Sequence, residues 1–461
     1  MYLKRVTLRN IKCFAELELD FTPSGSQPRK WTAVLGQNGL GKSTLLQAIG
    51  AALAGPGAIR ELMPVAEGWV RSGQAYGEIE AELLWTEGDA QTPHWPKTKT
   101  PYIARYIVTG ENIEALPSSV AEQYTVPVIV DWPGEGTPRE REKISKDMSR
   151  LKLTAYAEGK RGWFACGYGP FRRLSGGAQA ADRILYSGRK SARFITLFRE
   201  DAALTDATEW LISLHNTARE GDESSKYSLE QVKKVFREEL LPRPAELLVN
   251  AHSALLRIDG QDGVPFRDLS DGYRSMLALG IDLLRWAVVA NPDNPNILNI
   301  PGVVLIDELD AHAHPAWQRQ LGHWLRHKFP NLQFIITTHS PFLAQVADEP
   351  GGNIVLEQTP DGVSKRDKVE LVEKWRADQI LTDLLELPTT RSPEVERKIK
   401  RFQELSQNVH DLPAQQKQEY EQLRLWVEDL PPALEDQNER RQAEAIQAAA
   451  NRSAELIKEL E

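Results

Sequence analysis

A glycine-rich segment with the sequence GQNGLGKST occupies residues 36–44. It directly follows the short apolar run Trp31–Leu35 and precedes apolar residues at helical spacing. This order of strand, loop and helix is the context in which a Gly-x-x-x-x-Gly-Lys-Ser sequence forms a phosphate-binding loop. Glycines let backbone N–H groups close around phosphates, and the start of the following helix adds its positive dipole. The segment therefore predicts a nucleotide site at the end of a buried strand.

The residue types in this loop predict individual contacts with ATP. We expect Lys42 to reach the β- and γ-phosphates and the Ser43 hydroxyl to ligate Mg²⁺. A chance glycine-rich turn is the alternative, and the flanking strand and helix argue against it. The complete predicted ATP-binding set is Gly36, Gln37, Asn38, Gly39, Leu40, Gly41, Lys42, Ser43 and Thr44.

Two further apolar runs end in polar residues that suit ATP chemistry. Val303–Ile306 runs into Asp307 and Glu308, and the strand-like sequence QFIITT ends just before His339. At such strand ends Asp307 can hold Mg²⁺ through water, Glu308 can polarise the attacking water, and His339 can hydrogen-bond a γ-phosphate. Taken singly, a solvated turn and a capping histidine are the alternatives. Strands alternating with helices predict a largely parallel sheet with its site at the strand ends.

The sequence LSDGYRS opens the helix that we expect over Ser270–Val289. Ser270 can cap this helix, and the backbone N–H groups of its first turn can bind an anion. A plain N-cap is the alternative. A second segment, Leu174–Gly177, has the sequence LSGG, but it lies far from Asp307 in the chain. We interpret it as a loop, because the helix before Val303 feeds the next strand directly.

Together these segments resemble the ABC-type ATPases of the SMC, RecF and overcoming-lysogenization-defect class. The opening MYLKRVTLRNIKCFAELELDF is similar to their N-terminal hairpin, GQNGLGKST to Walker A, and LSDGYRS to their signature motif. LIDELDAHAHP is similar to Walker B with the D-loop, and TTHSP to their switch histidine. The resemblance covers residues 1–85 and 266–356. It implies an α/β fold: an ABC/SMC-like P-loop ATPase head with a mixed sheet.

The resemblance also implies roles for residues. Lys42, Glu308 and His339 would be catalytic, and Ser43 and Asp307 would hold Mg²⁺. Two heads would sandwich two ATP molecules, so that Ser270, Asp271 and Gly272 contact the ATP of the opposite protomer. A homodimer of heads or a higher homo-oligomer follows.

The pattern along the chain predicts four parts. Residues 1–85 and 264–370 would form the two halves of the head, with Walker A in the first and the signature, Walker B and switch histidine in the second. Residues 86–263 would be an insertion of mixed structure. Residues 371–461, which are helical and charged, would be an appendage for oligomerisation or partner binding.

The appendage and part of the insertion resemble Septu PtuA-type ATPases, through Leu381–Glu394 and Gly167–Arg173. Proteins of that type are linked to an HNH nuclease, PtuB, in antiphage defence. The resemblance implies an ATP-hydrolysing regulatory subunit of a prokaryotic defence complex that controls an HNH-type nuclease in trans, because this chain carries no nuclease motif of its own. The alternatives are an SMC/RecF-like DNA-repair ATPase that binds DNA directly, and a scaffold that binds ATP without hydrolysing it.

Composition limits the remaining choices. The net charge is −9, so DNA contact requires a local patch, for which Arg172 and Arg173 are candidates with a solvated loop as the alternative. Two cysteines, Cys13 and Cys166, are too few for a disulfide scaffold. The start of the chain lacks an apolar signal region, and the longest apolar run, near Leu277–Ala290, is broken by charges. We therefore expect a cytoplasmic protein without a membrane segment.

Overall fold

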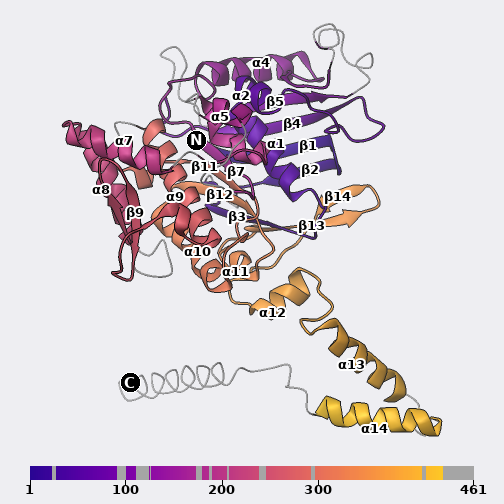
Figure 1. Cartoon of the computed structure of the whole chain (residues 1–461). Helices are drawn as coiled ribbons and strands as arrows, with labels where there is room; N and C mark the ends of the chain where they lie inside the picture. Colours follow the sequence, from indigo (N-terminus) through magenta and orange to yellow (C-terminus); the bar gives the residue numbers. More distant parts are fainter. Residues whose placement is uncertain are drawn as a thin grey trace, which may run out of the picture. The chain divides into compact units, whose positions relative to one another are not determined.

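The computed structural model describes residues 1–22, 27–90, 100–110, 124, 126–172, 179–185, 189–204, 207–237, 245–291, 296–406 and 412–428. The chain divides into two compact units, Met1–Glu386 and Leu387–Glu461, and Figure 1 shows their elements. Among the described residues, no helix is both long and apolar enough to cross a membrane.

A six-stranded sheet in the order β14-β13-β3-β12-β11-β7 forms the centre of the first unit. The strands from β13 to β7 are parallel, whereas β14 pairs antiparallel with β13 at one edge. The mixed sheet predicted from the sequence is therefore confirmed. Its strands are β3 (Trp31–Leu35), β7 (Phe164–Tyr168), β11 (Gly302–Ile306), β12 (Leu332–Thr337), β13 (Asn353–Thr359) and β14 (Gly362–Lys365).

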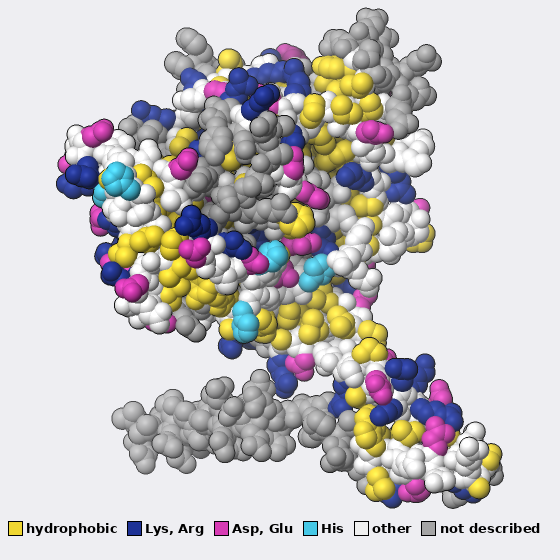
Figure 2. All heavy atoms as spheres, in the orientation of Figure 1, with side chains coloured by type: hydrophobic (Ala, Val, Ile, Leu, Met, Phe, Trp, Pro, Cys, Tyr) yellow, Lys and Arg dark blue, Asp and Glu magenta, His cyan; other side chains and the backbone are white. Residues whose placement is uncertain are grey.

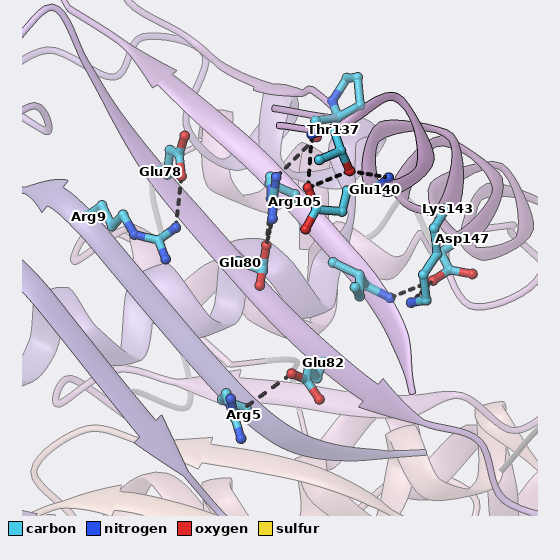
Figure 3. Close-up of polar contacts among 12 residues, drawn as sticks. Arg5, Arg9, Glu78, Glu80, Glu82, Arg105, Thr137, Glu140, Lys143 and Asp147 are labelled. Atoms are coloured by element: carbon cyan, nitrogen blue, oxygen red, sulfur yellow. Dashed lines mark hydrogen bonds and ion pairs between the residues drawn. The ribbon is translucent and has the colours of Figure 1, made fainter. Parts of the chain in front are cut away.

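A five-stranded antiparallel sheet in the order β2-β1-β4-β5-β6 contains the predicted opening hairpin. Burial alternates strictly along β4, as expected for a sheet with one face in the core. The other face carries rows of opposite charges, among them Arg9 with Glu78 at 3.1 Å and Arg105 with Glu80 (Figure 3). The strands are β1 (Tyr2–Ile11), β2 (Phe14–Asp20), β4 (Tyr76–Leu84), β5 (Tyr102–Thr109) and β6 (Ile129–Asp131).

Helix α1 (Lys42–Ala54) packs in the core that the two sheets share. Its Leu45 and Ile49 belong to the same buried cluster as Leu8 of the antiparallel sheet and Leu305 of the central sheet. The neighbouring Ile306 joins a different cluster on the opposite face, with helices α9 (Asp271–Ala290) and α10 (Pro315–Lys328). Because each such side chain contributes about 1.5–3 kcal/mol when fully buried, these two layers hold β11 firmly in place.

The remaining elements of this unit are shorter or peripheral. A three-stranded sheet, β10-β9-β8, contributes buried residues to the same cluster as helices α7 and α8. The elements are α2 (Pro56–Leu62), α4 (Pro138–Leu153), α5 (Gln179–Leu185), η2 (Lys190–Phe194), α6 (Ile195–Phe198), α7 (Ala207–Arg219), α8 (Glu223–Arg237), β8 (Ala245–Val249), β9 (Ala254–Ile258), β10 (Val264–Pro265), η3 (Phe266–Asp268), η4 (Ile297–Asn299) and α11 (Pro341–Ala344).

Residues 86–263 are more closely integrated into the head than an insertion would be. β5 and β6 complete the antiparallel sheet, and β7 pairs in parallel with the Walker B strand β11. The sequence of β7, FACGY, is buried throughout, so it lacks the alternation that marks a half-buried strand. It also has no β-branched residue, which is why the pattern of the sequence did not indicate it.

Residues 371–386 belong to the first unit, although the sequence places them in the appendage. They include the short helices α12 (Ala377–Gln379) and η5 (Ile380–Leu384). Ile380 and Leu384 are buried in one cluster with Leu35 and Val355 of the central sheet. Apolar packing, and not helical content, therefore decides where the first unit ends.

The second unit contains two described helices, α13 (Pro393–Ser406) and α14 (Ala414–Glu428), which contact each other. Phe402 stacks on Tyr420 with ring centroids 5.4 Å apart, and Arg401 forms a bidentate ion pair with Glu419 at 2.9 and 3.0 Å. Phe402 of α13 thus contributes to the contact between the two helices.

We predict that truncation after Glu386 leaves the first unit folded. All strands of both large sheets precede this point, and residues 1–386 form a compact unit by themselves. The main thermal transition should stay within about 2 °C of the full chain. A cut after Leu371, which removes Ile380 and Leu384, is the matched control and should lower the transition. Equal loss of stability in both truncations would contradict the boundary.

Candidate functional site

The three predicted nucleotide segments lie at one edge of the central sheet. β3 pairs in parallel with β12, with Val34 opposite Thr337, and β12 pairs in parallel with β11, with Ile336 opposite Ile306. Each of these strands ends where a predicted motif begins. The carboxyl ends of neighbouring parallel strands thus bring Walker A, Walker B and the switch histidine together.

The loop before α1 has the backbone shape that phosphate binding requires. Gly41 has φ 78° and forms the N-cap of α1 without a side-chain cap, so the first N–H groups of the helix have no side-chain acceptor. A Cβ at Gly41 would collide with Cys13 and Phe14, which leaves glycine as the residue that fits. The side chain of Ser43 is exposed at the loop. The arrangement can therefore receive an anion.

Lys42 lies inside this loop and beside the acidic motif. Its Nζ donates to the carbonyl oxygens of Gly36 and Gln37, each at 2.9 Å, and the residue is 7% exposed. Burial lowers the pKa of Lys42, while the carboxylates of Asp307, Glu308 and Asp310 act in the opposite direction. The predicted neighbourhood of Walker A and Walker B is thus present.

A threonine organises the end of the Walker B strand. The Thr337 hydroxyl donates to Asp307 Oδ1 and accepts from the backbone N–H of Glu308 at 2.7 Å. Glu308 itself has φ 46°, a left-handed conformation that costs a non-glycine residue about 1–2 kcal/mol. The hydrogen bond that its backbone N–H donates to the Thr337 hydroxyl helps to hold it there. The sequence analysis did not single out Thr337, although it ends the strand before His339.

Asp310 connects Walker B to the switch segment. Its Oδ1 accepts from the Thr338 hydroxyl and from the backbone N–H of His339 at 3.3 Å. The Nε2 atom of His339 is buried and has no partner among the described residues. Burial, and then the charge of Lys42, lowers the pKa of His339, so its imidazole is neutral at pH 7. A neutral imidazole with an unsatisfied ring nitrogen can bind a phosphate oxygen. Sequence reasoning missed Asp310, despite its place in LIDELD.

The signature segment lies at an exposed helix start. Ser270 is the exposed N-cap of α9, and Asp271 forms an ion pair with Arg274. Gly272 packs against the D-loop, because a Cβ there would lie 2.8 Å from the His312 carbonyl oxygen. Contact of this segment with an opposite protomer stays a prediction. The competing segment, 174–177, lies outside the described residues.

Arg172 occupies a position that the sequence analysis did not foresee. It is 4% exposed, so it is neither part of a solvated loop nor available to DNA. It contacts the Walker B end of β11 and helix α9. Arg173 lies outside the described residues.

The donor set at the strand ends fits Mg²⁺. The Asp307 carboxylate and the Ser43 hydroxyl are the oxygen ligands that this ion prefers, and they belong to the two motifs that meet beside Lys42. Bound there, the ion would neutralise charge on the phosphates of ATP.

The fold and the site define a P-loop ATPase head. A family described as "AAA domain, putative AbiEii toxin, Type IV TA system" matches residues 111–344, and the chain belongs to this family. A second family description, "AAA domain", matches residues 5–82. The two matches together span both halves of the head.

The chain is also similar to Septu and retron proteins, in keeping with the predicted resemblance to Septu PtuA-type ATPases. It is 24% identical to the Septu protein PtuA of Bacillus mycoides over 346 residues, which cover 74% of this chain and 38% of that protein. It is 47% identical over 76 residues to the "Retron Vc95 probable ATPase" of Vibrio cholerae, covering 16% of this chain and 15% of that protein. The chain thus spans well under half the length of these relatives.

The structural likeness concerns the fold. The crystal structure of an SMC head bound to the C-terminal winged-helix domain of ScpA matches with a TM-score of 0.50 at 16% identity. The match covers 81% of this chain and all of that one. The predicted SMC-like head is therefore confirmed.

We predict that Lys42→Ala weakens ATP binding at least 100-fold, about 2.7 kcal/mol, because no other described cation lies within the phosphate loop. Titration with a fluorescent ATP analogue measures the change. Lys146→Ala, at an exposed position on α4, is the control and should bind normally. Retained affinity in Lys42→Ala would overturn the site assignment.

We predict that Glu308→Gln keeps ATP affinity but lowers kcat by about 10²–10⁴-fold, since an amide cannot take a proton from water. Steady-state phosphate release, compared with equilibrium ATP binding, separates the two effects. Glu142→Gln, on exposed α4, should hydrolyse at the parent rate. Parent-like turnover by Glu308→Gln would show that another group polarises the water.

Proposed function

We propose that this protein is an ATP-binding and ATP-hydrolysing regulatory subunit of a prokaryotic antiphage defence complex. The observation that carries the proposal is the convergence of Lys42, Asp307, Glu308 and His339 at one sheet edge. Similarity to Septu and retron proteins supplies the biological setting. Because Cys13 and Cys166 are both free thiols, which suits a reducing compartment, we place the protein in the cytoplasm.

The chemistry follows from what each side chain can reach. The backbone N–H groups of residues 36–44 and the Nζ of Lys42 would hold the phosphates of ATP. The Glu308 carboxylate would orient and polarise the attacking water, and neutral His339 would hydrogen-bond the γ-phosphate. Asp307 and Ser43 would hold Mg²⁺. We expect slow turnover, as suits a switch.

Two heads would pair around two ATP molecules. The exposed start of α9, with Ser270, Asp271 and Gly272, would complete the ATP site of the second copy. An uncapped helix start adjacent to the D-loop can contact a phosphate supplied from outside its own chain. The bound state would then be a homodimer or a higher homo-oligomer.

The paired heads would control an HNH-type, PtuB-like nuclease in trans. The relatives named Septu protein PtuA support a defence role for the chain. The α13–α14 unit is the proposed contact, for the partner or for a second copy. Its Leu425 is 60% exposed, which leaves apolar area to cover.

A DNA-binding repair ATPase is the second candidate, and α4 is the feature that favours it. Lys and Arg side chains gather over this helix in Figure 2. Several of them are already neutralised, for example Lys143 and Arg150 by Asp147, and Lys146 by Glu142. Salt-sensitive binding of duplex DNA by the isolated protein would favour this candidate.

Co-purification tests the proposal most directly. The protein should be isolated with its genomic neighbours, with and without ATP, from the full chain and from the chain truncated after Glu386. ATP-dependent recovery of a nuclease with the full chain alone would support the regulatory role. Equal recovery with both would remove the second unit from the interface.

We predict that Ser270→Arg weakens ATP-dependent pairing of heads about tenfold or more, because a long cation replaces a small hydroxyl at the proposed interface. Binding of ATP to a single head should not change. Light scattering in the Glu308→Gln background measures pairing. Ser175→Arg, in the competing LSGG segment, is the control and should pair normally. The reverse pattern would make 174–177 the signature.

A further inference from the structure

Arg172 lies four residues after the end of β7 and reaches the proposed site through backbone and hydroxyl oxygens. Its Nε donates to the Ser275 hydroxyl of α9 at 3.2 Å. One terminal nitrogen donates to the carbonyl oxygens of Asp307 at 3.0 Å and Gly169 at 3.4 Å. The other donates to the carbonyl oxygens of Glu308 at 3.1 Å and Ala311 at 3.4 Å.

These contacts satisfy the full donor capacity of the side chain. A guanidinium has five N–H donors in a rigid fork, and here five oxygen atoms accept them. A buried, singly held cation would be costly, so the complete set of acceptors is what permits Arg172 to be 4% exposed. Burial lowers its pKa to about 10, and the group therefore stays charged at pH 7.

The contacts fix the backbone of one residue in particular. Glu308 is in the left-handed region, its N–H bonded to Thr337 and its carbonyl oxygen bonded to Arg172. Thr337 thereby holds the peptide group before the Cα of Glu308, and Arg172 holds the peptide group after it. The direction in which the Glu308 side chain leaves the backbone depends on both.

The same guanidinium reaches the signature helix. Ser275 lies just over one turn beyond Ser270, the N-cap of α9, and is buried. A shift of α9 when its exposed start meets an opposite head would therefore move one of the five acceptors of Arg172. The other four belong to the end of β7, the Walker B end and the D-loop.

We propose that Arg172 is a positioning residue. It orients the Glu308 carboxylate toward the attacking water and couples this orientation to the position of helix α9. The inference rests on the proposed ATPase function. It assigns a role to the segment GYGPFRR, which the nucleotide contacts leave without one. A rigid five-donor fork suits the task, because a lysine ammonium has three donors and could not serve five acceptors.

The test compares Arg172→Ala with Arg29→Ala in the full chain. Arg29 is a matched control, because it is 6% exposed and also donates to backbone carbonyls, those of Asp20 and Pro350. Arg29 lies before the first residue of β3, whereas the phosphate loop follows the last residue of β3. The control is therefore at the other end of the strand from the proposed site. Arg172→Ala should lower kcat about 10- to 100-fold, the cost of misplacing a catalytic group by about 1 Å, with ATP Kd within about threefold. Arg29→Ala should keep kcat.

A double-mutant cycle separates positioning from general damage. In the Glu308→Gln background, Arg172→Ala should lower the residual rate less than about twofold, because groups that act as a unit lose their effects together. An additive loss, or weaker ATP binding at unchanged kcat, would overturn the inference. Ser275→Ala, which removes the α9 contact alone, should lower kcat at least about threefold and carries the test if Arg172→Ala does not fold.

The same measurements separate a failure of the proposed ATPase function from a failure of the positioning role alone. If the parent chain binds ATP but releases no phosphate, the proposed hydrolysis fails and the positioning role fails with it. If the parent hydrolyses ATP and Arg172→Ala does so at the same rate, only the positioning role fails.

Discussion

The parallel register of β3, β12 and β11 is the constraint on which the site depends. Backbone hydrogen bonds between these strands place three loop starts at one edge of the sheet. None of the loops could form the proposed site separately, because Lys42, Asp307 and His339 come from distant parts of the chain. The buried layers on both faces of β11 keep this register from slipping, since a shift of one residue would exchange the two faces.

The end of β11 leads into a residue with an unfavourable backbone conformation. Glu308 takes a left-handed conformation that ordinary residues avoid, and it is stabilised by Thr337 on one side and Arg172 on the other. Strain of this kind persists where surrounding contacts over-determine it, and such positions gather at functional sites. Here one of the two contacts comes from β12 and the other from the segment after β7, a strand contributed by the region between the two halves of the head.

This arrangement gives the middle of the chain a structural role in the head. Residues 86–263 supply two strands to the antiparallel sheet and the edge strand of the central sheet. The region is therefore part of the head that carries the nucleotide motifs. The likeness to an SMC head covers 81% of the chain, in keeping with this integration.

Short-range pattern was enough to predict the opening hairpin, β3, α1, β11, β12 and helix α9, because alternation, short apolar runs, helical spacing and turn residues act within a few positions. The P-loop, Asp307, Glu308 and His339 were equally visible, since their chemistry is tied to strand ends. The tertiary structure alone decided the rest. β7 looked like no strand because, unlike the equally buried β11, it contains no β-branched residue. Arg172 looked like a surface cation because its five acceptors are backbone or hydroxyl oxygens, most of them from distant segments. Backbone acceptors cannot be recognised from the residue types in a sequence, so only the folded arrangement of strands and helix reveals them.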